Sequence, residues 1–272
     1  MENNVLNGNE KENIIKVTEL SKTFHLSAKQ RKLEHSGTKT KTAADHVSFC
    51  VKRGEAFGLL GPNGAGKTTT LRMLATLLRP DSGDAVLDGS SIVTQPEEIR
   101  RKIGFLTSEL KLEDFFTPDY LFDFFSQLYG IPTAKRDTRK KMLFERFGIR
   151  EFVQVKVKDL STGMKQKVSL VIALVHDPEI IIFDEPTNGL DILTAKVVTD
   201  FLLDLKEQGK TIIVSTHIFS LVEKLCDRVG IIINGRMVAC EDLRTLCGDK
   251  SLEDRFFEIY ETVNGEGGEY DQ

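Results

Sequence analysis

The chain contains 272 residues, of which 40% are hydrophobic and 29% are charged, and its formal net charge is −4 at pH 7. This length accommodates one large domain, or one domain with a subdomain, and the composition is ordinary for a soluble globular protein. A net negative charge gives no support to broad electrostatic binding of nucleic acid, and we expect no nucleic-acid partner.

Neither the cysteines nor the apolar segments indicate an extracellular or membrane-spanning protein. The cysteines form no C-x-x-C pair and have no nearby histidine in the sequence, so we expect reduced thiols in a cytoplasmic protein. Residues 1–13 form a polar tail, unlike a signal peptide. No window approaches the roughly 18 consecutive apolar residues of a membrane span. The cysteines are Cys50, Cys226, Cys240 and Cys247.

The first part of the chain alternates short apolar runs with polar segments. We predict strands at 14–20, 46–51, 55–60 and 85–89 and a helix at 68–78. The first two strands are separated by a basic insertion, residues 25–42, in which lysine and arginine outnumber acids. Such a run is usually a solvated loop, and contact with anionic lipid head groups is the alternative.

Residues 110–158 differ from the rest of the chain and are predicted to form a helical subdomain inserted into an α/β core. Thr117 before a proline is a typical helix start, and apolar residues then recur at helical spacing until Gly130. A second helix is predicted at 137–147. The aromatic face at 120–129 is a candidate docking surface for a membrane partner, and packing inside the subdomain is the alternative for these side chains.

The α/β pattern resumes after this subdomain. We predict helices at 162–175, 192–208 and 218–226, strands at 180–183 and 211–216, and a hairpin around Asn234-Gly235. Continuous apolar strands that alternate with helices imply a mostly parallel sheet flanked by helices. The last residues, 250–272, are interpreted as an acidic C-terminal tail.

The strongest chemical signal follows the predicted strand at 55–60. It is a G-x-x-x-x-G-K-[ST] pattern between a strand and a helix, the context that indicates a phosphate-binding P-loop, or Walker A motif. Glycines let backbone N–H groups converge on the β- and γ-phosphates, the lysine adds a cation, and the threonine offers a hydroxyl to Mg²⁺. The spacing disfavours a Rossmann loop. The residues are Gly61, Pro62, Asn63, Gly64, Ala65, Gly66, Lys67 and Thr68.

Two further strands end in candidate catalytic side chains. Asp184 lies at the carboxyl end of its strand, where ligands bind in such sheets, and we expect its carboxylate to hold Mg²⁺ as a Walker B aspartate does. Glu185 is adjacent and is expected to accept a proton from the attacking water. His217 leaves the strand at 211–216 at the same edge and is predicted to act near the γ-phosphate.

The stretch DLSTGMKQK at 159–167 distinguishes among the many nucleotide hydrolases that share these features. The order of phosphate loop, helical insertion, this stretch, Asp184-Glu185 and His217 resembles the ATP-binding cassette family, the nucleotide-binding subunits of ABC transporters. The resemblance covers about residues 14–249, which we expect to form one ABC ATP-binding domain. It implies a P-loop NTPase fold of the ABC-type ATPase class, with N-terminal antiparallel strands and an inserted helical subdomain.

The resemblance also implies ATP and Mg²⁺ as ligands and a head-to-tail dimer with a second ABC subunit, expected to be a homodimer. ATP on the loop of one cassette would be covered by the signature helix start of the other, so that hydrolysis depends on closure. Phe24 would stack on adenine, and an ordinary strand-end aromatic is the alternative. The implied further site residues are Thr69 on ATP, the signature Ser161, Thr162, Gly163 and Met164, and Asp191 in the D-loop.

The chain departs from the usual family pattern in two places. The usual signature is L-S-G-G-Q, whereas Thr162 and Met164 occupy its third and fifth positions. The family commonly has Gln, which contacts Mg²⁺ and the lytic water, where this chain has Ser108, and neighbouring Glu109 can substitute only in part. With these features the chain is most similar to cassettes of ABC-2 exporters, and among them to the sodium-efflux, Nat-type subunits.

We therefore predict an ATPase that couples dimer closure to export through a separate polytopic membrane permease. This partner would hold the chain on the inner face of the cell membrane, and sodium-ion efflux is the transport activity that the subgroup suggests. A soluble ABC-type ATPase acting on the ribosome or DNA is the alternative. Ribosome-acting members normally fuse two cassettes, and DNA-repair members insert a long coiled coil, whereas this chain has one cassette and no heptads. Transport is favoured.

Overall fold

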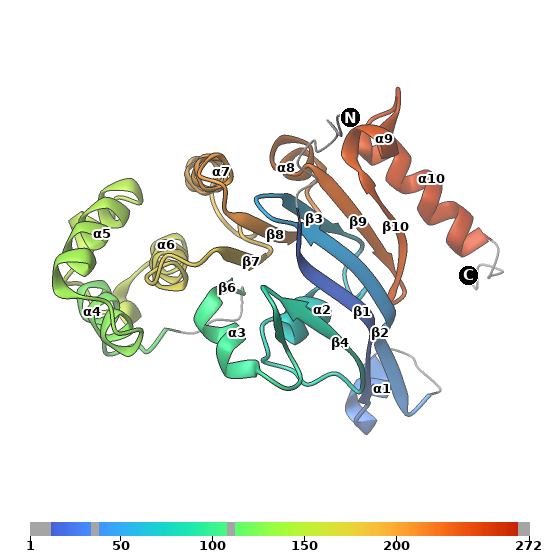
Figure 1. Ribbon diagram of the computed structural model, residues 1–272, viewed down its shortest axis with the longest axis horizontal. Helices are drawn as coiled ribbons and strands as arrows, with labels where there is room; N and C mark the ends of the chain where they lie inside the picture. The colour runs from blue at the N-terminus through green and yellow to red at the C-terminus, as the bar shows by residue number, and fades with distance from the viewer. Residues whose placement is uncertain (1–11, 34–37, 108–111, 266–272) are drawn as a thin grey trace, which may run out of the picture.

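The computed structural model describes residues 12–33, 38–107 and 112–265, and Figure 1 shows their arrangement. Within these residues the strands form a larger sheet of six strands and a smaller sheet of four. In spatial order the larger sheet contains β10 (Arg236–Asp242), β9 (Arg228–Ile233), β3 (Ala56–Leu60), β8 (Thr211–Thr216), β7 (Ile180–Asp184) and β6 (Ile103–Leu106). The smaller sheet contains β2 (Thr40–Lys52), β1 (Asn13–His25), β4 (Ser82–Leu87) and β5 (Ser90–Ser91).

The strand directions confirm the predicted fold class. From β9 to β6 the larger sheet is parallel, and β10 joins it antiparallel to β9. The turn between β9 and β10 has Asn234 at φ 50° and Gly235 at φ 82°, as the predicted type I′ hairpin requires. The smaller sheet, which contains the N-terminal strands, is antiparallel throughout.

Helices cover both faces of the larger sheet, as the predicted α/β pattern requires. Their boundaries lie within a few residues of the predicted ones wherever a helix was expected at all. The helices are α1 (Ala28–Leu33), α2 (Lys67–Leu74), α3 (Pro96–Lys102), α4 (Pro118–Leu128), α5 (Thr133–Arg146), α6 (Thr162–Ala173), α7 (Ile192–Glu207), α8 (Phe219–Leu225), α9 (Leu243–Cys247) and α10 (Leu252–Gly265). Short 3₁₀ turns occupy Ile149–Phe152 and Val157–Asp159.

Two hydrophobic cores lie on the two faces of the larger sheet. One core joins α2 and the smaller sheet, and the other joins α4 to α8 and α10. Strand β7 contributes to both, because Ile180 and Ile182 pack in the first core while Ile181 and Phe183 pack in the second. Each fully buried side chain of this size contributes about 1.5–3 kcal/mol. The continuous apolar run of β7 is thus explained by burial on both faces.

Residues 118–159 contain α4, α5 and the two 3₁₀ turns, at one end of the molecule (Figure 1). Thr117 caps α4 as expected, since its hydroxyl accepts the N–H of Tyr120 at 3.2 Å. Helix α5 begins at Thr133, four residues before the predicted Asp137, because Pro132 directly precedes the first helical turn instead of belonging to a longer connection. Phe122 and Phe144 pack edge to face at 5.4 Å and join the two helices.

The C-terminal residues differ from the expected acidic tail. Residues 252–265 form α10, and Leu252 and Phe256 are buried in the second core. Apolar residues here recur at helical spacing, at Leu252, Phe256, Ile259, Tyr260 and Val263, and the acidic residues take the other face. The prediction of a tail rested on the acidic composition and overlooked this amphipathic pattern. Residues 266–272 lie outside the described part of the chain.

The basic insertion at 25–42 is shorter than expected. Strand β1 continues to His25 and β2 begins at Thr40, so that these strands are longer than the hydrophobic pattern predicts. Cross-strand pairing, including Phe24 with Lys41, extends them beyond their apolar parts. Between them lies α1, and residues 34–37 fall outside the described residues.

His176 joins the helical end of the molecule to the larger sheet. Its ring stacks on Tyr129, at the end of α4, with 3.9 Å between ring centroids, and its Nε2 lies 3.1 Å from the carbonyl of Ile103 in β6. Burial lowers the pKa of His176 to about 4, with a smaller lowering from nearby Arg139. The imidazole of His176 is therefore held neutral where the end of α4 meets β6.

This buried histidine predicts a specific sensitivity to acid. The unfolded chain binds more protons than the folded chain between the ordinary histidine pKa of 6.5 and about 4, so the free energy of unfolding falls as the pH falls through that window. We expect His176→Phe, which keeps an aromatic ring on Tyr129, to lose less stability between pH 7 and pH 5 than the wild type. Urea unfolding at both pH values measures this difference.

An equal loss of stability in the wild type and His176→Phe would contradict the prediction.

Candidate functional site

Three parallel strands end side by side at the edge that carries the candidate site. In the larger sheet Leu60 of β3 pairs with Thr216 of β8, and Ser215 of β8 pairs with Asp184 of β7. The residues that follow these strands are Gly61, Glu185 and His217. The carboxyl ends of parallel strands meet at one edge, so the fold itself brings the three predicted motifs together.

The loop from Gly61 to Gly66 connects β3 to α2 in a space that excludes side chains at two positions. A Cβ atom at Gly61 would lie 2.2 Å from the carbonyl oxygen of Ile232. One at Gly66, which has φ 109°, would lie 2.0 Å from the carbonyl oxygen of Ala43. Glycine is therefore required at both places, and the N-terminus of α2 is left open towards the loop with its N–H groups and partial positive charge.

Lys67, the first residue of α2, lies folded back into this loop. Its side chain is buried, and Nζ donates to the carbonyl oxygens of Gly61 at 2.7 Å and Pro62 at 3.1 Å. Burial lowers the pKa of Lys67, and the negative charges of Glu185 and Asp184 oppose that shift. A cation that is short of water and held by neutral carbonyls is well suited to receive a phosphate anion.

Asp184 is buried beside this lysine and receives two hydroxyl groups. Thr68 Oγ1 donates to Asp184 Oδ1 at 3.1 Å, and Ser215 Oγ donates to the same oxygen. A carboxylate and a hydroxyl facing a phosphate loop form the hard oxygen set that suits Mg²⁺, which takes its remaining ligands from phosphate and water. The residues present therefore fit the predicted Mg²⁺, and Thr68 and Asp184 are the side chains that could hold it.

Glu185 turns away from Asp184 because its backbone adopts φ 52°, in the left-handed region. Its Oε1 lies 3.0 Å from His217 Nδ1 and 4.0 Å from Lys67 Nζ. Among the described residues, its buried Oε2 has no hydrogen-bond partner. A buried carboxylate oxygen without a partner is costly, which indicates that it serves a ligand or a water molecule at this edge.

Lys67, Thr68 and Glu185 line one pocket of about 280 Å³ that reaches from the phosphate loop to the smaller sheet. At the far end lie Phe24 and Lys41, which pair across β1 and β2. An aromatic ring at one end and converging N–H groups at the other match the two ends of a nucleotide. The lining residues are Phe24, Lys41, Ala43, Asn63, Gly64, Ala65, Gly66, Lys67, Thr68, Thr69 and Glu185.

Sequence reasoning missed three residues of this region. Lys41 and Ala43 line the pocket from β2, and Ser215 bonds to Asp184 from β8. The register of β1 with β2 and of β7 with β8 brings them there. The only sequence signal was the alternation of each strand, which gives the face of a residue and not its neighbour on the next strand.

The signature residues lie elsewhere. Ser161 caps α6, accepting the N–H of Met164 at 3.3 Å, and Ser161 and Thr162 are exposed. No residue from 161 to 164 is among the described residues that line the pocket. Figure 1 shows α6 beside α4 and α5, on the side of the molecule away from the smaller sheet. The predicted Q-loop residues Ser108 and Glu109 lie outside the described part of the chain.

Asp191 lies close to the signature of its own chain. A Cβ atom at Gly163 would lie 3.9 Å from Asp191 Oδ2. Asp191 also caps α7, because Oδ1 accepts the N–H groups of Leu193 at 3.0 Å and Thr194 at 3.1 Å. Hydrogen bonds from Thr194 and Leu193 lower the pKa of Asp191. Asp191 thus fixes the start of α7 beside the start of α6.

Comparison with known proteins gives one consistent family. Residues 44–188 match the family model described as ABC transporter. The chain is 42% identical over 213 residues to the ABC transporter ATP-binding protein NatA of Bacillus subtilis (strain 168), covering 78% of this chain and 87% of NatA. It is 38% identical over 198 residues to the Nod factor export ATP-binding protein I of Ralstonia nicotianae, covering 73% of this chain and 62% of that protein.

A solved structure shows the same arrangement. The fold is similar to that of the ATP-binding cassette MJ0796 in a dimeric, post-hydrolysis state bound to ADP and Pi. The TM-score is 0.74 at 26% sequence identity, over 85% of this chain and 99% of the other.

The geometry of Lys67 predicts that this lysine is essential for nucleotide binding. Because a charge-assisted contact in a partly dehydrated loop is lost, Lys67→Ala should weaken ATP binding by at least about 100-fold. Isothermal titration calorimetry measures the change.

Lys210→Ala is the matched control, since Lys210 is also buried and also donates to a backbone carbonyl, that of Asp177. It should bind ATP as the wild type does. Similar ATP affinities in Lys67→Ala and the wild type would contradict the assignment of the pocket.

Proposed function

The chain belongs to the ABC transporter family, as the ATP-binding and ATP-hydrolysing subunit of an exporter, and we propose that it works by closing on a second cassette around ATP. One observation carries this proposal. The phosphate loop, Asp184, Glu185 and His217 meet at a single sheet edge, whereas the signature is exposed on α6, outside the pocket. The signature of a second chain can therefore cover the open side of this pocket.

We propose the following roles within one subunit. Lys67 and the N–H groups of the loop bind the β- and γ-phosphates, and Phe24 stacks on the base. Thr68 and Asp184 hold Mg²⁺, which when bound neutralises charge that develops on the phosphates. Glu185 accepts a proton from the attacking water on Oε2, the oxygen without a hydrogen-bond partner among the described residues. His217 contacts Oε1 and so orients the carboxylate.

We propose a head-to-tail dimer in which Ser161, the N–H groups of α6 and Asp191 approach the partner's ATP. The surface beside them supports contact with another protein. Ile192 and Leu193, directly after Asp191, are 87% and 77% exposed. Two adjacent apolar side chains this far out of a fold are typical of residues covered by a partner. The same family includes the dimeric cassette bound to ADP and Pi described above.

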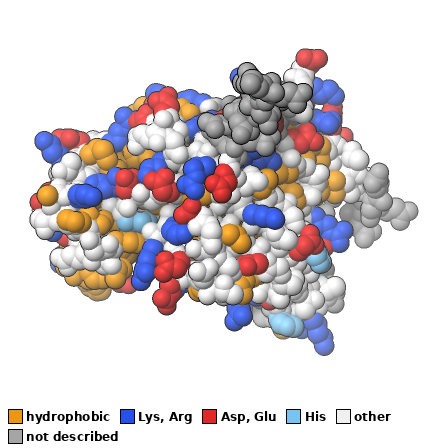
Figure 2. All heavy atoms as spheres, in the orientation of Figure 1, with side chains coloured by type: hydrophobic (Ala, Val, Ile, Leu, Met, Phe, Trp, Pro, Cys, Tyr) orange, Lys and Arg blue, Asp and Glu red, His pale blue; other side chains and the backbone are white. Residues whose placement is uncertain are grey.

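We propose that a polytopic permease docks on the helical end of the molecule and holds the chain at the inner face of the cell membrane. Among the described residues, no helix is long and apolar enough to cross a membrane. An aromatic patch surrounds a hollow of about 590 Å³ here, and Figure 2 shows hydrophobic side chains gathered over α4 and α5. The patch consists of Phe115, Phe116, Tyr120 and Phe124.

The aromatic residues of this region divide between the two interpretations given above. Phe122 is buried and packs against Phe144, so it belongs to the core. Phe116, Tyr120 and Phe124 instead form an exposed stack, with ring centroids 4.5 and 6.2 Å apart. A stack on the outside gains little from the fold itself, which supports a docking role.

The domain boundaries are part of the proposal. We assign residues 14–249 to the nucleotide-binding domain, with 110–158 as its helical subdomain. Helix α10 then packs on this domain from residues beyond its proposed end.

Removing the proposed base should trap the closed state. Glu185→Gln keeps the size of the side chain but cannot take up the proton, so ATP should remain bound and the dimer should persist. Gel filtration with Mg-ATP should show the variant as a dimer. The control Glu179→Gln, at the opposite end of β7, should remain like the wild type. A Glu185→Gln variant that stays monomeric would count heavily against dimer closure.

The aromatic patch predicts a separation of docking from hydrolysis. Phe124→Glu places a charge on the patch and should strongly reduce co-purification with the proposed polytopic permease, while the isolated subunit still binds ATP. Phe257→Glu on α10 is the matched control, because Phe124 and Phe257 are 47% and 48% exposed. Equal membrane-protein recovery with both variants would place the docking surface elsewhere.

A further inference from the structure

The turn between β9 and β10 lies wedged between the phosphate loop and β2. The N–H of Gly235 donates to the carbonyl oxygen of Ala65 in the loop at 2.9 Å. The carbonyl oxygen of Gly235 accepts the N–H of Asp45 in β2 at 2.8 Å. Two peptide groups of one turn residue therefore connect the loop to the smaller sheet.

The wedge has little spare room. A Cβ atom at Gly66 would lie 3.5 Å from the Cα of Gly235, and one at Gly235 would lie 3.3 Å from the carbonyl oxygen of Ala43. Loop, turn and strand are thus in direct contact. A shift of the turn must displace either the loop or β2, because packed interiors transmit such shifts.

The two elements that the turn connects hold opposite ends of the pocket. Lys41 of β2 lines the base end, and Ala65 to Thr69 line the phosphate end. These elements belong to different sheets, so strand pairing within either sheet does not set the distance between the two ends. The turn adds its two hydrogen bonds to the direct contact between Gly66 of the loop and the Ala43 carbonyl of β2, and so helps to set this distance.

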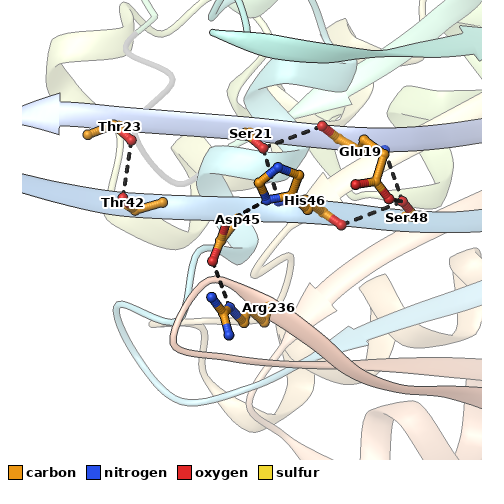
Figure 3. Close-up of polar contacts among 8 residues, drawn as sticks. All are labelled: Glu19, Ser21, Thr23, Thr42, Asp45, His46, Ser48 and Arg236. Carbon is orange, nitrogen blue, oxygen red and sulfur yellow. Dashed lines mark hydrogen bonds and ion pairs between the residues drawn. The ribbon is translucent and has the colours of Figure 1, made fainter.

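Side chains at the turn lock it against β2. Arg236 Nε donates to Asp45 Oδ2 at 2.6 Å, and the other carboxylate oxygen lies 2.7 Å from His46 Nδ1 (Figure 3). The Arg236 guanidinium, and to a lesser degree His46, hold the pKa of Asp45 below its usual range. The N–H of His46 donates to Ser21 Oγ at 3.0 Å, which ties the cluster to β1 as well.

A second contact attaches the turn to the C-terminal helix. Asn234 Nδ2 donates to Asn264 Oδ1, near the end of α10, at 3.3 Å. Helix α10 is anchored in the core by Leu252 and Phe256. The turn is therefore held from two sides, by Asp45 on β2 and by Asn264 on α10.

We propose that Asp45 and Arg236 are positioning residues for nucleotide binding: their ion pair locks the β9–β10 turn and so sets the separation between the base end and the phosphate end of the pocket. This inference rests on the proposed function, since it takes a nucleotide as the ligand of the pocket. Neither side chain lines the pocket, and both act through the backbone of Gly235.

The proposal differs from an ordinary role of a surface ion pair in stability. An exposed pair that only stabilises the fold would change the unfolding transition and leave the affinity of the folded protein for nucleotide unchanged. A pair that sets the shape of the pocket changes that affinity. ADP is a suitable probe, because it contains the base and the β-phosphate and cannot be hydrolysed by the same reaction.

The experiment measures the Kd of ADP by calorimetry, and the apparent Tm without ligand, for Arg236→Ala, Asp45→Asn and the double variant. We expect each single variant to raise the Kd by about 2- to 5-fold, within the range expected for a single exposed charge pair. The double variant should raise it no further, because both changes break the same interaction. Arg236→Lys should restore part of the affinity.

Arg101→Ala is the matched control. Arg101 forms an ion pair with Glu98 on α3, and the side chains of Arg236 and Arg101 are 72% and 70% exposed. This variant should bind ADP as the wild type does. Asn264→Ala provides a second, independent perturbation of the turn and should raise the Kd by a smaller factor.

An unchanged Kd in folded Arg236→Ala and Asp45→Asn would overturn the inference, and so would additive effects in the double variant. If Arg236→Ala does not fold, Asp45→Asn and Asn264→Ala provide the same comparison. A wild-type chain that does not bind ADP would remove the proposed function and with it this inference. Wild-type binding with unaffected variants would remove the inference alone.

Discussion

The parallel pairing of β3, β8 and β7 is the constraint on which the site depends. Backbone hydrogen bonds set their register, and this register places the first residues after the three strands at one edge. Burial on both faces fixes β7 in that register, because a shift by one residue would exchange the side chains of two cores. Lys67 reaches this edge through the glycine loop after β3, and Glu185 reaches it through its left-handed backbone after β7.

This constraint also explains which parts of the protein the sequence could predict. The phosphate loop, the strand before Asp184 and the cap at Thr117 are local patterns, and local patterns can be read from spacing and residue type alone. The order of the motifs indicated the family, and the resemblance to that family implied the role of the signature. The fold class followed from continuous apolar strands alternating with helices.

The rest could not be predicted because it depends on contacts between distant segments. Lys41 and Ser215 reach the site through strand register, and Arg236 meets Asp45 across 191 positions of the chain. Helix α10 had a readable apolar spacing, but its acidic composition favoured a tail over a helix. The start of α5 was predicted too late, because Pro132 can either end one helix or directly precede the next, and here it precedes α5.

The second core gives the molecule a mechanical property that its surface does not reveal. Phe122 of α4, beneath the exposed aromatic stack, and Phe183, directly before Asp184, belong to the same continuous set of buried side chains. A close-packed interior has low compressibility, so a displacement of α4 is transmitted through the buried side chains that contact it. Helix α4, which carries the exposed aromatic stack, and β7, which ends at Asp184, are therefore joined by continuous close packing, so a displacement of one is transmitted towards the other.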